Sequence, residues 1–368
     1  MTTPREFADR LHGQGCPVAR TDEGIFVVGH EEAKTVALNP EAFSSAVSAH
    51  LQLPNGLDGE EHARWRGLVD SYLGPERVRA AEPEFARTAA EIVSGLRPGT
   101  VEAVMGLGAS FAVRGMLRWL GWPEDLAGEL VQWVKDNQAA TRSGDRDATA
   151  EVARRYDAIV RGVVEPRRAR PRAYQDVTAE LARDRSLGRE LSVEELVSVL
   201  RNWTAGDLGS MAACVGVIAY GLANHTELQD RLSQAVSDEE YEAILNELLR
   251  IDDPFVSNRR KATRPALLGG DEIAAGEVIH VHWTGANRDP RTFESPDEPR
   301  PSENAPENLV WGIGPHACPG RGLSLMELRV FFRALLGRFA IAAGTHGTRA
   351  SYPVGGWESL EITLKERS

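Results

Sequence analysis

One ten-residue stretch, from Trp311 to Gly320, constrains this chain more than any other; it reads Trp-Gly-Ile-Gly-Pro-His-Ala-Cys-Pro-Gly. A helical pattern follows at once, from Pro319 to about Phe339. Proline is favoured at the first position of a helix, because its missing N–H would have no partner there in any case. The stretch therefore predicts a turn-rich loop that brings Cys318 to the N-terminus of a long helix.

The surroundings of Cys318 predict an ionised sulfur. A helix N-terminus carries roughly half a positive charge and several free N–H groups, which stabilise an anion and lower a thiol pKa. We therefore expect a thiolate. Gly312, Gly314 and Gly320 would allow the backbone to fold tightly beneath a flat ligand, because glycine adopts positive φ at little cost and has no Cβ.

Four interpretations of Cys318 are open from the residues alone. A single cysteine is most often a buried structural residue, because free cysteine is among the most buried residue types. A zinc ligand is poorly supported, since only His316 is nearby and no second cysteine pair has finger-like spacing. A catalytic nucleophile would need a base that the sequence does not identify. The remaining interpretation is a ligand of heme iron.

The complete pattern favours the last interpretation. The stretch consists of an aromatic residue followed by Gly-x-Gly-x-His-x-Cys-x-Gly, and Glu327 lies nine residues after the cysteine. This pattern resembles the heme-binding signature of the cytochrome P-450 family. The family usually has Phe where this chain has Trp. The resemblance implies heme b as cofactor, with the Cys318 thiolate as its metal ligand, which favours O–O cleavage. It assigns to the heme-binding loop the residues Trp311, Gly312, His316, Cys318 and Gly320.

Length and composition fit a large folded chain. With 368 residues, 42% hydrophobic and 26% charged, it can bury a sizeable core, and length alone would suggest two domains. The resemblance instead implies a single mainly helical domain over 1–368 with small β-sheets, a triangular helical prism enclosing heme. Its expected parts are a lesser β region near 20–43, a helical heme region at 60–340 and a C-terminal hairpin at 350–364.

The net charge and the cysteine content limit which partners and which cellular compartment we expect. A net charge of −12 argues against nucleic acid as a partner. Three scattered cysteines, Cys16, Cys214 and Cys318, predict a reducing compartment. The first ten residues are polar and charged, so we expect no membrane anchor. The sequence predicts a soluble, cytoplasmic monomer.

Helical periodicity and turn residues divide the rest of the chain. Ser192, with Glu195 three residues later, predicts a capping box at the start of the longest helix. The arginine-rich stretch 166–172 is interpreted as a solvated connector. Helices are expected at 30–38, 60–72, 76–98, 101–120, 124–140, 192–232 and 238–251, with a polar loop at 141–146 and short strands at 24–28, 259–264 and 273–278.

Several basic residues match the family's propionate-binding positions. His62 and Arg66 lie four residues apart on one face of a helix. Taken alone, they would be a solvated surface pair. The resemblance implies that they bind a heme propionate, together with Arg260 and His316, because charge-assisted bonds to a carboxylate are strong and Arg suits its geometry.

The central helix departs from the family pattern. Ala205 and Gly206 match the small pair where this helix passes over the heme, which makes Ala205 a cofactor-binding candidate. The family then places an acid and a threonine that relay protons. Here those positions hold Leu208 and Gly209. The usual proton relay is therefore absent from the sequence.

Two neighbouring polar residues, Asp207 and Ser210, could replace the relay if the helix is locally displaced, and with Gly206 they are the catalytic candidates. At helical spacing, Asp207 should point about 100° away from the expected acid position. The stretch 43–59 is also shorter than the cover that family members usually have over this face of the heme. We expect a more open pocket.

Glu247 and Arg250 form an E-x-x-R motif inside a predicted helix. Alone, such a pair is a common and weak surface ion pair. In the family it is buried and supports the cysteine loop. A second Arg often completes it, but here Glu298 stands at that place, with Arg300 two residues later. The third member is left open.

The resemblance predicts an oxidoreductase of bacterial secondary metabolism. It would oxidise a small molecule or peptide-like natural product with O2 and electrons from separate partners, ferredoxin and an NAD(P)H-dependent ferredoxin reductase. The alternative is oxidative C–C or C–N coupling of aromatic groups, which the missing relay and the short cover favour modestly. A non-catalytic heme sensor is a third and weaker hypothesis.

Overall fold

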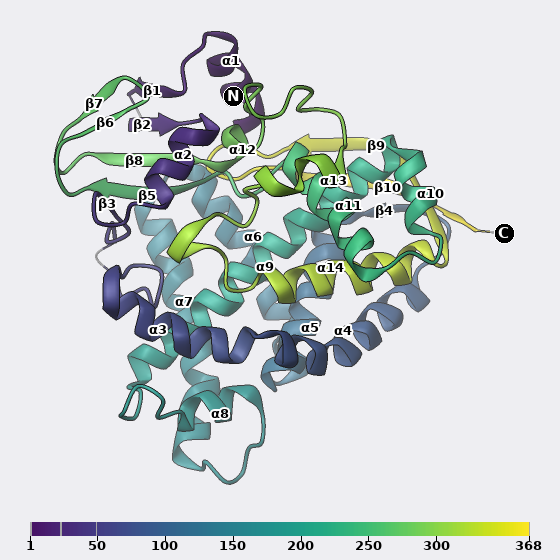
Figure 1. Ribbon diagram of the computed structural model, residues 1–368. Coiled ribbons are helices and arrows are strands. Elements are labelled where there is room, and N and C mark those ends of the chain that lie inside the picture. The colour runs from purple at the N-terminus through teal and green to yellow at the C-terminus, as the bar shows by residue number, and fades with distance from the viewer. Residues whose placement is uncertain (1, 23, 49, 368) are drawn as a thin grey trace.

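The chain is mainly helical with small β-sheets, as predicted (Figure 1). The computed structural model describes residues 2–22, 24–48 and 50–367. Its α-helices are α1 (Pro4–Gly13), α2 (His30–Ala37), α3 (Gly59–Leu73), α4 (Pro75–Gly95), α5 (Ser110–Leu120), α6 (Ala127–Ser143), α7 (Arg146–Ala169), α8 (Val177–Arg183), α9 (Val193–Asn224), α10 (Thr226–Leu232), α11 (Asp238–Ile251), α12 (Trp283–Ala286), α13 (Pro301–Asn304) and α14 (Arg321–Leu336).

Helix α9 crosses the middle of the molecule, and α5, α7, α11 and α14 pack around it (Figure 1). By length and composition α9 could span a membrane, but 61% of its most apolar window is buried inside the protein. It is therefore a core helix. Where α9 passes the segment before α5, a Cβ on Gly108 would lie only 2.8 Å from the Cα of Ala212. Glycine at 108 thus permits a direct backbone contact with α9.

The predicted capping box begins α9. The Glu195 N–H donates to the Ser192 hydroxyl at 3.2 Å, and the Ser192 N–H donates to the Glu195 carboxylate at 2.8 Å. The helix ends before the predicted Leu232, because His225 leaves helical geometry with φ −118° and ψ 74°. The short helix α10 follows as a separate element.

The stretch 101–120 is not one continuous helix, contrary to the prediction. It begins in strand β4 (Gly99–Glu102), and a π-helical segment, η1 (Ala103–Ala109), precedes α5. The Glu102 carboxylate accepts three N–H groups of η1 at 2.6 to 3.0 Å. This capping stabilises a wider helical turn that the side-chain periodicity does not reveal.

Two expected connections are more helical than predicted. The loop at 141–146 is shorter, because α6 continues to Ser143 and α7 begins at Arg146. The arginine-rich stretch is partly helical, since α7 runs to Ala169. Arg167 is buried and donates to the Asp176 carboxylate at 2.8 to 3.0 Å. This part of the stretch forms a structural ion pair, and the connector interpretation is wrong for it.

The larger sheet has the strand order β1-β2-β8-β5-β3, in which β2 and β8 are parallel and the other neighbours antiparallel. The N-terminal strands fulfil the prediction near 20–43, and β5 and β8 join them from the second half of the chain. The strands are β1 (Val18–Thr21), β2 (Gly24–Val27), β3 (Phe43–Ser44), β5 (Ser257–Ala262), β8 (Val278–His282) and, in a separate two-stranded sheet, β6 (Ala266–Leu268) and β7 (Asp271–Ile273).

The C-terminal hairpin is longer than the predicted 350–364. Its arms are β9 (Phe339–Arg349) and β10 (Trp357–Glu366), and β4 pairs with the other edge of β10. Helix α14 ends at Leu336, so the first arm precedes the expected hairpin. Gly356, with φ +71°, lies in the turn between the arms.

Helix α11 has the predicted bounds and holds a buried ion pair. Arg250 donates from Nε and Nη2 to the Glu247 carboxylate, each at 2.8 Å, and both residues are at most 1% exposed. The open third position is filled by Asn304, whose amide donates to Glu247 at 2.6 Å, and by the backbone N–H of Arg300 at 2.9 Å. The Arg300 side chain pairs instead with Glu298, so it does not complete the network.

Candidate functional site

A cavity of about 330 Å³ lies between α9 and the loop that precedes α14. The structure brings most of the predicted site residues into its wall. Ala205 is an exception, since it is not among the residues that line this cavity. The predicted residues in the wall are Gly206, Asp207, Ser210, Arg260, Trp311, Gly312, His316, Cys318 and Gly320.

The loop that carries Cys318 is closed by its own backbone. The Cys318 N–H donates to the Trp311 carbonyl at 2.8 Å, and Gly312 and Gly314 adopt φ of 68° and 75°, as predicted for tight turns. Gly320 is different: it has a helical φ of −82° and is the N-cap. Helix α14 therefore begins two residues after the predicted Pro319.

The Cys318 thiol faces the cavity, from which its sulfur is accessible, although protein surrounds it on the other sides. Burial raises the pKa of Cys318. The N–H groups of Gly320 and Arg321 and the charge of Arg66 act in the opposite direction, as expected for a helix start. Desolvation outweighs them, so the predicted lowering of the pKa is wrong for the protein alone.

Helix α11 positions the aromatic end of the loop. The Trp311 Nε1 donates to the Asn246 side chain at 2.7 Å, and Asn246 directly precedes the buried Glu247. The Trp311 ring lies 5.9 Å from the ring of Phe255, measured between centroids. The sequence prediction missed Asn246, because no local pattern links a helix to a loop 65 residues away.

A group of basic residues lies beside the loop. Arg260 is 8% exposed, and within the described part of the chain its guanidinium donates only to the Arg259 carbonyl, at 2.9 Å. Among the described residues no ion pair involves Arg260. Arg66 is outside the cavity wall and donates to the carbonyls of Pro315 and Ala317 at 2.9 and 2.7 Å. It therefore supports the backbone around the cysteine.

The two predicted histidines lie together. The rings of His62 and His316 are 4.1 Å apart between centroids, although His62 is not in the cavity wall. The His316 Nε2 lies 3.0 Å from the Ser45 hydroxyl and 3.3 Å from Asp58. Burial, helped by His62 and Arg260, lowers the pKa of His316 to about 4. His316 is therefore a neutral hydrogen-bonding group near pH 7.

One face of α9 forms the opposite wall. The α9 residues in this wall recur at helical spacing: Asn202, Trp203, Gly206, Asp207, Ser210, Met211 and Cys214. Leu208 is 1% exposed in the core, and Gly209 is outside the wall. The expected acid position is thus the one turned away from the cavity, and the carboxyl and hydroxyl of Asp207 and Ser210 lie on the cavity face.

Two buried carboxyl groups belong to this region. Burial raises the pKa of Asp207 to about 7, and burial together with Asp207 raises that of Glu327 well above its usual range. Both Glu327 oxygens, and the Asp207 Oδ2, lack hydrogen-bond partners among the described residues. The sequence signal for the buried Glu327 carboxyl is a single acid inside the apolar run Leu-Met-Glu-Leu of α14.

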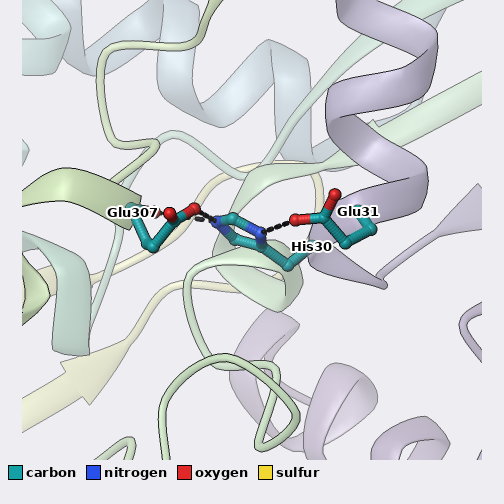
Figure 2. Close-up of side chains that lie close together, drawn as sticks. All are labelled: His30, Glu31 and Glu307. Atoms are coloured by element: carbon teal, nitrogen blue, oxygen red, sulfur yellow. Dashed lines mark hydrogen bonds and ion pairs between the residues drawn. The ribbon is translucent and has the colours of Figure 1, made fainter.

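A possible cation site elsewhere is already neutralised. Figure 2 shows His30 between Glu31 and Glu307, with Nδ1 3.3 Å from a Glu31 oxygen. The His30 Nε2 lies 2.8 Å from the Glu307 backbone carbonyl. Lys34 reaches both carboxylates, at 2.9 and 3.2 Å. An ammonium thus already bridges the two acids, and the cluster ties α2 to the segment before the cysteine loop.

Known proteins resemble this chain over most of its length. Cytochrome P-450 126 of Mycobacterium tuberculosis is 31% identical over 298 residues, which cover 78% of this chain and 70% of that protein. The polyketide biosynthesis cytochrome P-450 PksS of Bacillus subtilis is 26% identical, with coverage of 92% and 83%.

The fold also matches solved structures. The enzyme EryK from S. erythraea, in a mutant form with erythromycin B, superimposes with a TM-score of 0.88 over 98% of this chain and 95% of its own, at 21% identity. A family model described as cytochrome P-450 matches residues 146–351, which contain α9, α11 and the cysteine loop. The chain therefore belongs to the cytochrome P-450 family, whose members are monooxygenases with a cysteine-ligated heme.

Proposed function

We propose that this enzyme oxidises a small bacterial natural product, with heme b bound between α9 and the cysteine loop. The single observation that carries the proposal is the cavity with Cys318 on one wall and Gly206, Asp207 and Ser210 on the other. Heme, when bound there, supplies dioxygen activation with electrons from external donors. The protein residues supply the thiolate, the charges and the orientation of the substrate.

The residues present fit a heme. A Cβ on Gly206 would meet no atom within 4 Å, so α9 leaves open space where a flat group would lie. Arg260 is a buried cation without an ion-pair partner among the described residues, which suits an anionic propionate. His316 and His62 lie close to the same end of the cavity. We assign Arg260 and His316 to direct contact, and Arg66 to support of the loop.

The variant Arg260→Ala tests the propionate assignment. We expect it to bind heme about tenfold more weakly or worse, because hydrogen bonds to charged groups contribute about 1.5–3 kcal/mol. The measurement is the ratio of heme to protein absorbance during dialysis against apomyoglobin, which captures released heme. The matched control is Arg259→Ala, at the exposed neighbouring position of the same strand. Equal heme loss from both variants would contradict the assignment.

The cavity supports a substrate with a flat or apolar body. Its wall includes Trp119 and Trp203, whose ring centroids are 5.8 Å apart, as well as Phe255. Asn55 and Asn202 add amide groups. The relative named for polyketide biosynthesis and the structure with erythromycin B agree with a secondary metabolite as substrate.

Hydroxylation is the better supported of the two reactions. Oxidative coupling needs no proton relay, whereas here an acid and an alcohol share the face of α9 that lines the cavity. The raised pKa of Asp207 keeps its carboxyl partly protonated near pH 7, so that it can donate a proton. We propose that Asp207 and Ser210 replace the acid and threonine that the sequence lacks.

Asp207→Asn is expected to lower product formed per NAD(P)H by about tenfold to a hundredfold and to raise peroxide release, since general acid catalysis typically contributes about 10²–10⁴-fold. Ser210→Ala should act in the same direction. Product, peroxide and NAD(P)H are quantified together in the reconstituted system. Leu208→Met, a change of a neighbouring residue that faces the core, is the control. If the Asn variant forms as much product per NAD(P)H as the unaltered enzyme, the alternative reaction, oxidative C–C or C–N bond formation, would be favoured.

Electron transfer and location complete the proposal. Bacterial members of the family generally use redox partners such as ferredoxin, and we propose ferredoxin and its NAD(P)H-dependent reductase as donors here. We further propose a cytoplasmic monomer that folds as a single domain over 1–368. The packing of α5, α7, α11 and α14 around α9, with β9 and β10 of the C-terminal sheet against the same helix, supports the single domain.

A further inference from the structure

A second cavity, of about 450 Å³, lies outside the heme region. It is formed by α1, β2, the end of β8 and the turn at 351–352, where α1 and α12 lie side by side (Figure 1). No residue that the structure describes lines both this cavity and the one that contains Cys318. Its volume lies within the range of small-molecule sites in proteins, about 300–1,000 Å³.

One wall contains a buried hydrogen-bond donor that has no partner among the described residues. His282 is 0% exposed, and its Nδ1 accepts the Gly285 N–H at 3.0 Å. Because Nδ1 accepts, the proton of the neutral ring is on Nε2. Burial lowers the pKa of His282 to about 3, so the ring is neutral. The Nε2 has no partner among the described residues, and a buried unpaired donor is rare enough to require an explanation.

Aromatic rings form the other walls. Phe7 meets Phe26 edge to face at 5.1 Å between centroids, and Phe26 meets Tyr352 in the same way at 5.6 Å. The His282 ring lies 5.7 Å from the Phe7 ring. Rings at several orientations around one space favour a flat aromatic guest, which can stack on one wall and meet another by its edge.

The rim is polar and nearly balanced in charge. Arg10 lies over the Phe7 ring at 5.6 Å and forms no ion pair with another described residue. Asp22 lies on the same rim. An acid and a base together favour neither a strongly anionic nor a cationic guest. Arg10 and His282 both donate, so the guest should offer acceptor oxygens.

We propose that this cavity is a second binding site, which takes a planar, neutral aromatic compound with a carbonyl oxygen. The rings of Phe7, Phe26 and Tyr352 hold its body, and the carbonyl accepts the His282 Nε2–H. The site extends beyond the proposed monooxygenase function and does not depend on it, because no residue of the cysteine-lined cavity takes part.

The test compares two probes of equal shape on the holoenzyme. In 2-acetylnaphthalene a carbonyl oxygen is present, and in 2-isopropenylnaphthalene a methylene group replaces it. Calorimetric titrations are made with clotrimazole saturating the heme iron, so that the first cavity is occupied. We expect the ketone to bind with one-to-one stoichiometry and about fivefold to tenfold more tightly than the hydrocarbon, the usual effect of one net hydrogen bond.

Variants locate the binding. Phe7→Trp enlarges a wall residue into the cavity and is expected to weaken both probes by about tenfold or more. His282→Phe should remove the preference for the ketone while the hydrocarbon still binds. The control is His12→Phe, which changes a nearby histidine that contacts Gly285 and is not in the cavity wall. The ferrous–carbonyl spectrum of each variant reports correct folding.

Three results would overturn the proposal: no binding of the ketone to the clotrimazole-saturated enzyme, equal affinity for the two probes, or unchanged affinity in Phe7→Trp. These readouts need no turnover. A failure of the monooxygenase proposal would appear instead as absent product with every candidate substrate, and it would leave the calorimetric result intact.

Discussion

Cys318→Ser is expected to abolish the thiolate-type spectrum of the ferrous–carbonyl heme and to reduce monooxygenase activity to background. The heme cavity offers Cys318 on the loop side, held by the 2.8 Å bond from its N–H to the Trp311 carbonyl. A serine at this position cannot donate electron density as a thiolate does, and that donation favours O–O cleavage. Carbonyl difference spectroscopy and product assays measure both effects.

The protein contains its own control for this prediction. Cys214 lines the same cavity from α9, but it is 1% exposed and burial raises its pKa well above the usual range. It should remain a neutral thiol, so Cys214→Ser is expected to keep the thiolate-type band. If the band survives in Cys318→Ser and is lost in Cys214→Ser, the iron ligand comes from α9 and the assignment is wrong.

Arg250→Leu is expected to lower the free energy of unfolding by about 3–5 kcal/mol, because it leaves a buried carboxylate without its cation. Of its partners among the described residues, Glu247 would retain the Asn304 amide and the Arg300 N–H. Arg250 also donates to the Asn287 carbonyl at 2.9 Å, which would lose its partner. Chemical denaturation of the holoenzyme, followed by tryptophan fluorescence and heme absorbance, measures the loss.

An exposed pair of the same type is the matched control. Arg231 donates to the Glu240 carboxylate at 2.6 and 2.8 Å, and both side chains are largely exposed. Exposed ion pairs contribute little, so Arg231→Leu should leave the denaturation midpoint nearly unchanged. Equal destabilisation by the two substitutions would show that burial does not determine how much the Glu247–Arg250 pair stabilises the folded protein.

The sequence predicted those features that depend on neighbours along the chain. The capping box at Ser192 and Glu195 formed as expected, because both of its bonds are local. Helix α11 has the predicted bounds. Gly312 and Gly314 adopt the positive φ that a tight loop requires. The family signature brought the loop, Arg260 and the central helix into one hypothesis, and the structure places them around one cavity.

The missed features depend on contacts between distant segments. Asn304 completes the Glu247 network from a segment 57 residues away, so no spacing rule identifies it. The acid position was assigned by counting along a motif, whereas in the structure Asp207 faces the cavity and Leu208 lies in the core. The Cys318 pKa was predicted from the helix start alone, whereas burial has the larger effect.

The contact between Gly108 and Ala212 determines more than packing density. A side chain at 108 would displace the backbone of α9 at Ala212. Ala212 lies within one helical turn of Ser210 and Met211, which line the cavity. One residue of an α-helix corresponds to about 100° of rotation, so even a partial turn of α9 would exchange which side chains meet the substrate. Evolution or engineering could thus retune the selectivity of this enzyme from a position that the substrate never touches.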